Sequence, residues 1–359
     1  MNIIIESIIK SGYIVFLILN MGTLLSFLER KQSALIQDRI GANRATIFGF
    51  RFKGLFHILA DTIKLFTKED YIPPSGNKFL HIIAPGISVF FAVVSFCAIP
   101  FGNTLQIGEY IINLQVTNIP IGLLLVFALT SMGVYGVVLA GLSSNNNFGL
   151  LGALRAASQM LSYEITMGAS VIGLIMIYGN LHLQEIVHYQ GQNLWGWLPA
   201  WGIFLQPLAF ILFLTASVAE TKRVPFDAPE GESEIIGYYI EYSGMKFAMF
   251  MMADFLETVV VAGLITTLFF GGWQVPYLMA DGFHLPWGSF ISVSPTFVTI
   301  LQVMSFGMKL FFFAWFQMMI RWTLPRFRYD QIMKLGWKGL LPLSLINIFL
   351  TGIGILIFS

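Results

Sequence analysis

The chain has 359 residues, of which 56% are hydrophobic, 15% aromatic and 11% charged, and its mean hydropathy is +0.76. A soluble domain carries roughly 25% charged residues, so a soluble fold of this size could not bury this much apolar surface. The balance of 20 basic and 19 acidic residues argues against a nucleic-acid partner, and the single cysteine, Cys97, excludes a disulfide framework, a Cys-ligated zinc site and an iron–sulfur cluster.

Apolar runs long enough to cross a bilayer recur about eight times along the chain. About 20 residues are needed for each crossing helix. We therefore expect an all-α integral membrane protein that forms one domain over residues 1–359 and holds no metal. The predicted spans lie near 8–29, 81–101, 119–142, 157–178, 203–220, 246–271, 298–320 and 340–358.

The first run lacks a small-residue cleavage site and continues into Glu29-Arg30-Lys31, so we expect it to be retained as a helix. The segment 53–69 that follows is amphipathic. Its apolar side chains share a broad helical arc, while the polar ones lie opposite. This pattern predicts a surface helix on the cytoplasmic side, ended by Pro73-Pro74, and an ordinary membrane anchor is its simplest role.

Basic residues are distributed unevenly between the two sides. The connections that follow spans one, three, five and seven carry 18 of the 20 Lys and Arg residues, and the opposite loops near 102–118, 179–202 and 272–297 carry none. The positive-inside rule places the basic loops in the cytoplasm and both termini outside. A bacterial inner membrane is the expected location.

Six ionisable residues lie at the expected membrane depth, where each costs on the order of 2.5–3.5 kcal/mol if charged and unpaired. Some must therefore be protonated, paired or hydrated, as a proton path requires. Simpler interpretations remain open. Glu29 and Glu220 could be solvated at the interface. Asp254 and Glu257, at i and i+3, could form an internal pair, and Lys309 could neutralise either of them. The sixth residue is Glu164 in span four.

The connection 221–245 is an acidic loop interleaved with aromatic and aliphatic residues. If it is helical from about residue 230 onward, Glu230, Glu234 and Glu241 share one stripe and Glu232 points the other way. Like charges on one stripe would raise one another's pKa. An exposed acidic loop is the alternative.

A second polar group follows span three. In a helix, Arg155, Gln159, Ser162 and Tyr163 form one polar stripe, with Glu164 on the other side. A polar stripe that enters an apolar span is typical of a cavity lining or a subunit contact. Arg155 alone could simply mark the cytoplasmic side.

Together these segments resemble the H subunit (NADH dehydrogenase subunit 1) family of respiratory complex I, the proton-pumping NADH:quinone oxidoreductase. The resemblance extends over essentially the whole chain. It departs from the usual pattern at Ala42, at Asp254 and in the shorter spacing between Glu234 and Glu241. The matching segments are 29–31, 37–44, 60–69, 155–164, 219–227, 230–234, 241–248 and 326–331.

The resemblance implies eight transmembrane helices and no redox centre in this chain. A quinone, ubiquinone or menaquinone, is then the substrate, and iron–sulfur clusters and flavin belong to partner subunits. The implied partners are membrane lipid, peripheral quinone-site subunits with the terminal iron–sulfur cluster, and antiporter-like membrane subunits. The implied quinone-binding residues are Glu29, Arg30, Arg39, Asp61, Lys64, Arg223, Phe226 and Asp227, and the implied proton-relay residues are Glu164, Glu220, Glu230, Glu232, Glu234, Glu241 and Asp254.

Two other functions fit part of the pattern. A proton-coupled secondary transporter would explain the intramembrane acids, although such transporters usually show internal repeats, and we find no convincing one. A membrane anchor subunit of a related hydrogenase-type complex is the second alternative.

Overall fold

The computed structural model describes residues 3–107, 110–194, 197–231, 234–235, 237–279, 282–284 and 290–358. Within these residues, seven helices are long and apolar enough to cross a membrane. This confirms the prediction of an all-α integral membrane protein. The long helices are α1 (Ile3–Ile36), α3 (Lys78–Ser95), α4 (Gly122–Ser143), α5 (Asn147–Tyr178), α9 (Gly244–Phe269), α10 (Pro295–Thr323) and α12 (Leu341–Phe358), the last preceded by α11 (Tyr329–Lys334) and a π-helical turn, η2 (Leu335–Leu340).

The predicted span 203–220 differs, because the helix is broken at Gln206. A single turn, α7 (Gly202–Leu205), precedes α8 (Pro207–Glu220). Pro207 has no amide hydrogen to continue the helix from α7. The Gln206 side chain is instead bonded to Thr351 and Asn347 of α12, at 2.6 and 2.8 Å. Alone, α8 is about 21 Å long at 1.5 Å per residue.

Two helices extend well beyond their predicted ends. α1 continues to Ile36 through the charged Glu29-Arg30-Lys31. α5 begins at Asn147, ten residues before the predicted start, and the Asn146 side chain caps it by accepting from the Phe148 amide. Hydropathy indicates which part of a helix lies in lipid. Capping hydrogen bonds and ion pairs outside the lipid decide how far the helix extends.

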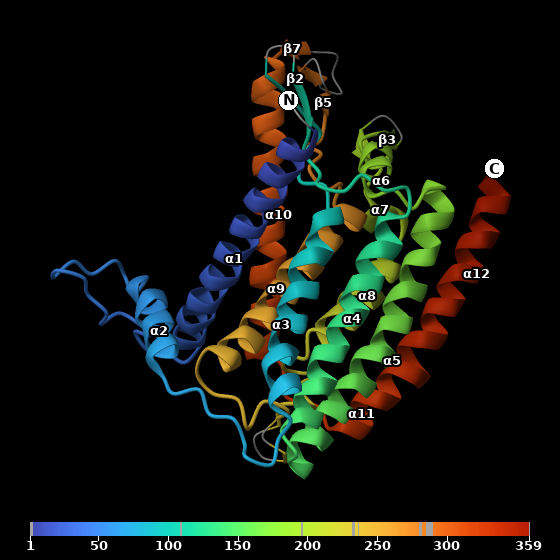
Figure 1. Ribbon diagram of the computed structural model, residues 1–359. Helices are drawn as coiled ribbons and strands as arrows, with labels where there is room; N and C mark the ends of the chain where they lie inside the picture. Colours follow the sequence, from blue (N-terminus) through green and yellow to red (C-terminus); the bar gives the residue numbers. More distant parts are fainter. Residues whose placement is uncertain are drawn as a thin grey trace.

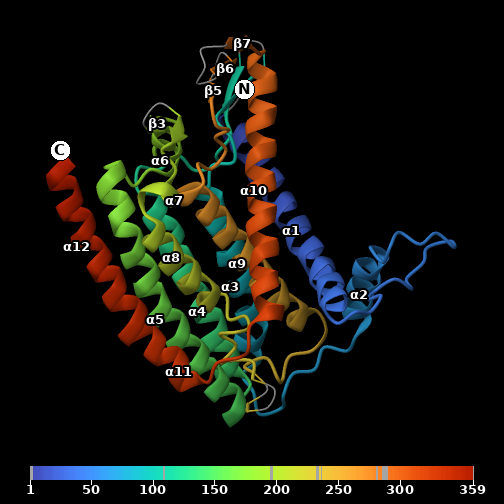
Figure 2. The same cartoon turned by 180° about the vertical axis from the view of Figure 1, so that it is seen from behind.

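Figures 1 and 2 show α3, α4, α5 and α12 side by side on one half of the bundle, with α1 and α10 on the other. Between the halves, α9 is buried along most of its length. α1 begins and α12 ends at the same end of the bundle. The surface helix α2 (Phe56–Thr67) lies near the opposite end of α1, at the edge of the molecule.

Short elements cap the end where α1 begins. They are the helices η1 (Phe96–Ala98) and α6 (Leu183–Gln190), and three small antiparallel sheets. In the first sheet Thr104 pairs with Asn113. The strands are β1 (Thr104–Ile107), β2 (Tyr110–Asn113), β3 (Asn193–Leu194), β4 (Leu198–Pro199), β5 (Leu278–Met279), β6 (Gly282–His284) and β7 (Phe290–Ser292).

Small residues allow the helices to approach closely. A methyl group built on Gly136 of α4 would collide with the Ser88 hydroxyl and lie 2.9 Å from the Ser88 amide nitrogen on α3. Close backbone approach through small residues is how membrane helices gain packing contacts, since lipid provides no hydrophobic drive between them. α3 and α4 are therefore a firmly packed pair.

Candidate functional site

A cleft of about 340 Å³ opens where α1, α9 and α10 approach the basic end of the bundle. Glu29 lines this cleft and is 8% exposed. One carboxylate oxygen of Glu29 accepts from Arg223 at 3.1 Å, and the other pairs with Arg321. Glu29 is thus a buried, doubly paired carboxylate, and the alternative of simple solvation at the interface is wrong.

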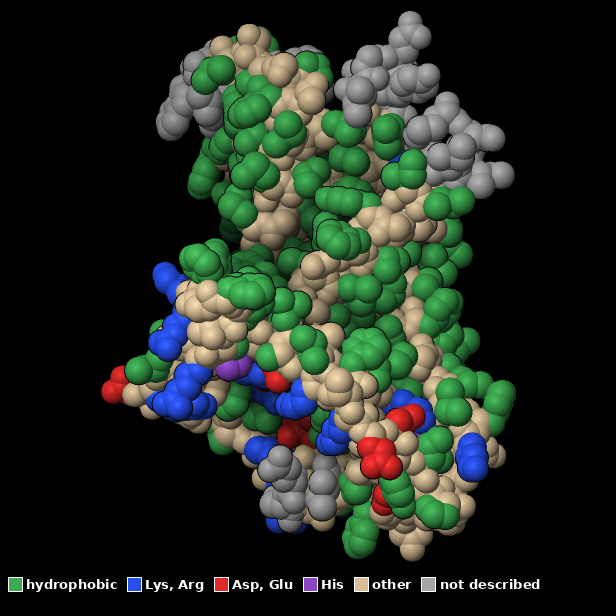
Figure 3. Space-filling view, turned by 60° about the vertical axis from the view of Figure 1, so that its left-hand side comes forward, with side chains coloured by type: hydrophobic (Ala, Val, Ile, Leu, Met, Phe, Trp, Pro, Cys, Tyr) green, Lys and Arg blue, Asp and Glu red, His purple; other side chains and the backbone are tan. Residues whose placement is uncertain are grey.

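The rest of the cleft is partly apolar and partly basic. Met251, Phe255 and Trp322 supply apolar surface, while Arg30 and Arg39 add positive charge. The Arg223 guanidinium lies 4.2 Å from the centroid of the Phe255 ring. Figure 3 shows basic side chains gathered across this level of the surface. Such a lining suits a ligand with a polar head and an apolar tail.

A second ionic cluster lies next to the first. The Lys222 ammonium is 2.9 Å from an Asp254 oxygen and 3.6 Å from a Glu257 oxygen, and only 2% of the Lys222 side chain is exposed. Burial alone would lower the pKa of Lys222, but the two carboxylates hold it well above its ordinary value. Asp254 and Glu257 are therefore joined through a lysine, and the interpretation as a directly bonded pair is wrong.

Lys309 does not neutralise either acid, contrary to expectation. Its ammonium donates to the backbone carbonyls of Phe270, Gly272 and Gln274 at 2.9, 3.0 and 2.6 Å. These groups follow the last turn of α9, about 22 Å along the helix from Asp254. A cation is favoured there because the helix leaves unpaired carbonyls at that end.

A third group of acids lies beside α4. Glu220 ends α8, is 6% exposed, and interacts electrostatically with Glu164 and Glu257. Glu164 accepts a hydrogen bond from Ser131. A hydroxyl of α4 therefore binds Glu164, and burial contradicts simple solvation of Glu220.

The acidic loop is not helical, so the predicted stripe of glutamates is wrong. The described residues between Glu230 and Ser243 form turns. Glu234 pairs with Arg155 at 2.7 Å, and Glu241 accepts from Asn146 at 2.8 Å. Pro229, Gly231 and Gly237 favour turns over a helix. Glu232 lies outside the described residues.

Two acids of this loop have raised pKa values. Burial raises the pKa of Asp227 to about 6, against the charges of Arg326 and Arg321. Burial and the neighbouring charges of Asp254 and Asp227 raise the pKa of Glu230 to about 8. The Glu230 amide donates to the Asp227 carboxylate at 3.2 Å. These groups can gain or lose protons near neutral pH.

The predicted polar stripe of α5 contacts other segments of the same chain. The Gln159 amide donates to the carbonyls of Ala219 and Phe226, at 2.7 and 2.6 Å. Tyr163 donates to the carbonyl of Ile332 at 2.8 Å. Gln159 therefore fixes both ends of the segment that carries the two ionic clusters.

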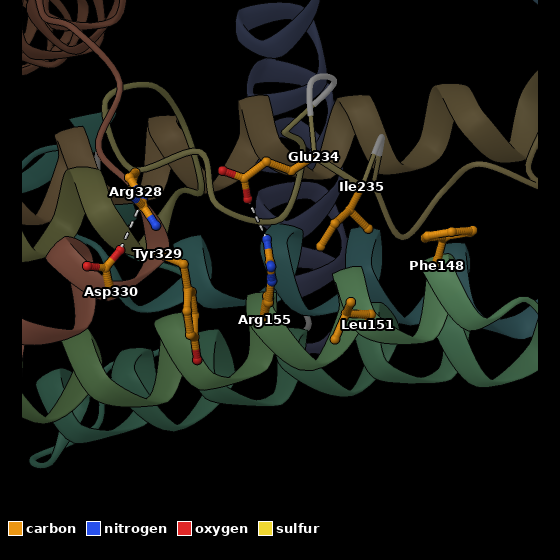
Figure 4. Close-up of a pocket in the computed structure, with 8 residues that line it drawn as sticks. All are labelled: Phe148, Leu151, Arg155, Glu234, Ile235, Arg328, Tyr329 and Asp330. Carbon is orange, nitrogen blue, oxygen red and sulfur yellow. Dashed lines mark hydrogen bonds and ion pairs between the residues drawn. The ribbon is translucent and has the colours of Figure 1, made fainter.

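Arg155 lies in a separate surface cleft of about 520 Å³ between α5, the acidic loop and α11. Figure 4 shows its ion pair with Glu234 above α5, beside a second pair between Arg328 and Asp330. The Arg155 guanidinium is 5.5 Å from the Tyr329 ring centroid. This cleft is lined by charges of both signs.

The remaining predicted quinone residues lie apart from one another. Asp61 pairs with Arg30 of the first cleft and with Lys64 at 3.4 Å, which connects α2 to that cleft. Phe226 packs between the rings of Tyr163 and Phe327, with centroids 5.7 and 5.6 Å away. The structure therefore does not bring all eight predicted residues to one surface.

Sequence reasoning missed two central cations, Lys222 and Arg321. Both were counted only as basic residues that mark the cytoplasmic side. Their positions held a signal: Lys222 is two residues past the end of α8, and Arg321 lies in the last turn of α10. A basic residue at the end of a span can turn back toward a buried acid.

Comparisons with known proteins agree on one family. The family model described as NADH dehydrogenase matches residues 9–352. An H subunit of the NADH-quinone oxidoreductase of Cytophaga hutchinsonii is 44% identical, and the match covers 100% of both chains. The corresponding H subunit of Flavobacterium johnsoniae is 43% identical over 91% of this chain and 89% of its own, and NADH-quinone oxidoreductase subunit 8 of Rhodothermus marinus is 41% identical over 97% and 98%. The chain belongs to the family of the H subunit of NADH-quinone oxidoreductase, a membrane component of complex I.

Proposed function

We propose that this chain forms the membrane half of the quinone passage of NADH:quinone oxidoreductase and the start of its proton path. One observation carries the proposal. Arg223 pairs with Glu29 in the cleft, and the preceding residue, Lys222, pairs with Asp254 and Glu257 inside the bundle. Two adjacent cations thus connect a cavity suited to a quinone with intramembrane acids. A charge that forms in the cleft has a short route to groups that exchange protons.

The polar and apolar parts of the passage have separate roles. A quinone tail leaves lipid only if protein offers comparable apolar surface, since each buried CH₂ contributes about 0.8 kcal/mol. Met251, Phe255 and Trp322 offer such surface, and the basic residues around Glu29 would receive the head group. Electrons arrive from a partner subunit, and two protons follow. The negative charge formed in between competes with Glu29 for Arg223.

The relay would then continue through the acids. A weakened Arg223–Glu29 pair changes the field at Lys222 and hence the protonation of Asp254 and Glu257. The protonation of Glu220 and Glu164 would change next. Glu230, Glu234 and Glu241 of the acidic loop would respond as the loop shifts, and Glu232 remains part of this proposal. Moving one charge against 100 mV costs about 2.3 kcal/mol, so the quinone step must supply that energy.

The charge distribution supports an orientation, and family membership supports the partners. The basic end with α2 and the acidic loop would face the cytoplasm of a bacterium, with both termini outside the inner membrane. Peripheral subunits that carry the terminal iron–sulfur cluster would cover this face, and antiporter-like subunits would receive the proton signal. Family membership supports this function and not the transporter or hydrogenase-anchor alternatives.

Neutral replacements of the deep acids test the proposal. We expect Glu220→Gln or Glu164→Gln in the assembled complex to abolish quinone-linked proton pumping, because each replaces a proton-exchanging carboxyl group with an amide of the same shape. Glu185→Gln, on the exposed side of α6, is the matched control and should pump normally. Pumping would be followed with a pH-sensitive dye in vesicles. Full pumping by both the Glu220 and the Glu164 variant would refute the proposed path.

A further inference from the structure

The segment 43–53 leaves the body of the protein and returns to the same point. At its base Gly54 has a φ of +94°, and a methyl group built there would collide with the carbonyl oxygen of Ala42. The Ala45 amide also donates to His57 of α2 at 3.2 Å. The segment, here named the aromatic loop, is therefore held at its base as one unit.

The far end of the aromatic loop is a tight turn with exposed aromatic rings. Ile47 and Phe50 exchange two backbone hydrogen bonds, at 3.3 and 3.0 Å. Phe48 is 98% exposed, Phe50 76% and Phe52 68%. Three large apolar rings on one short loop are too many to leave in water, and such patches usually mark a contact with protein or membrane.

The charge of the aromatic loop is entirely positive. Arg44, Arg51 and Lys53 flank the rings, and the chain has no acidic residue between Asp38 and Asp61. Basic side chains near a membrane surface each favour anionic lipid by about fivefold, and aromatic rings prefer the headgroup level. A surface that combines both matches a bilayer interface containing anionic lipid.

The position of the loop agrees with that surface. In Figure 1 the loop extends sideways past α2, at the height of the lower part of α1 rather than beyond the end of the bundle. α2 continues the apolar surface with an exposed stripe at helical spacing. Its members are Leu59, Ile63 and Phe66, with Leu55 directly before the helix.

We propose that the aromatic loop is a lipid anchor, which inserts Phe48, Phe50 and Phe52 among anionic headgroups beside α2. The anchor is independent of the proposed proton path. It would fix the outer end of α2 at the membrane surface, because the base of the loop is bonded to His57.

A single fluorophore measures the depth of the loop. Cys97 is the only cysteine, so Cys97→Ser with Phe48→Cys gives one labelling site on the full chain. In phosphatidylcholine–phosphatidylglycerol nanodiscs, we expect a shallow nitroxide lipid to quench the label and aqueous iodide to leave it unaffected. Ser75→Cys, in the exposed connection after α2, is the control and should show the reverse. Quenching of the Phe48 site by iodide overturns the anchor.

Charge and assembly are tested separately. The double variant Arg51→Gln with Lys53→Gln should lower the preference for phosphatidylglycerol about 25-fold, because two basic charges are lost. In the whole complex, a photo-crosslinker at position 48 should add a phospholipid mass to this chain. Crosslinking to another subunit instead overturns the proposal and identifies the loop as a protein contact.

Discussion

The most consequential single side chain in the structure is Lys222, a buried cation shared by two carboxylates. Removing one partner of a buried ion pair typically costs about 3–5 kcal/mol, because the remaining charge is left unpaired. We expect Lys222→Met to lower the free energy of unfolding by that order and to stop pumping. Denaturant unfolding of the purified chain measures the first effect, and vesicle acidification by the complex measures the second.

A matched variant separates burial from charge. Lys64 also pairs with an acid, Asp61, but 69% of its side chain is exposed. Lys64→Met should therefore cost less than about 1 kcal/mol, since exposed pairs are hydrated and screened. Equal losses in the two variants would show that Lys222 is not a buried link between Asp254 and Glu257.

Glu230 gives the fold a pH dependence. Its pKa is raised to about 8 in the folded chain, so the folded state holds a proton that the unfolded state releases near the ordinary value of 4.5. Stability should therefore fall as pH rises from about 5 to 8. Glu230→Gln cannot titrate and should flatten this part of the profile, measured as the melting temperature against pH. An unchanged slope would mean that the carboxyl is not buried as described.

At the scale of elements, α9 is bound at two levels by lysines from elsewhere in the chain. Lys222 binds its acids near the middle of the helix, and Lys309 binds the carbonyls that follow its last turn. Hydrogen bonds from a charged group contribute about 1.5–3 kcal/mol in favourable cases. We expect Lys309→Met to lower unfolding free energy by about 2–3 kcal/mol and to leave the proton path intact.

The measurement pairs unfolding with pumping in the assembled complex. Lys338→Met, exposed in the turn before α12, is the control and should leave both unchanged. If Lys309→Met stops pumping without loss of stability, the lysine belongs to the proton path after all.

Most elements were predictable because lipid imposes a length and a composition on each crossing. The break at Gln206 was not, since hydropathy sees one apolar run while the bonds to Asn347 and Thr351 form only in the folded bundle. The start of α5 at Asn147 was missed for a similar reason. The cap on Asn146 lies in a polar segment outside the membrane.

The site was predictable as a set of residue types but not as a set of partners. Acids at membrane depth cost too much to lack neutralisation, so each needed a partner. Which cation serves which acid depends on packing: Lys222 lies 32 residues from Asp254, whereas Lys309 looked equally available. The acidic loop is not helical, although its glutamates recur at helical spacing. Its prolines and glycines favour turns, and contacts to Arg155 and Asn146 hold the loop in that form.

At the scale of the whole molecule, the described ionic clusters lie toward the basic end, and the outer part of α9 is mostly apolar. Between Glu257 and Lys309, α9 is tightly buried and includes Val260, Leu264 and Leu268. The hydroxyls of its buried threonines donate to carbonyls of the same helix, four residues earlier. An interior packed this closely has little room for water, and a proton needs a chain of water or polar groups to cross. The described residues thus favour a signal that leaves the chain sideways rather than straight across the membrane.

That distribution predicts a proton-tight protein. The full chain reconstituted alone in liposomes should dissipate an imposed pH gradient no faster than empty liposomes, because the apolar length of α9 blocks a direct route. A pH-sensitive dye trapped inside reports the gradient, and gramicidin, which conducts protons, gives the positive control. Glu220→Gln should be as tight as the natural chain, since it removes a relay group on one side of the barrier. A leak in the natural chain that disappears in Glu220→Gln would instead place a complete transmembrane route inside this one subunit.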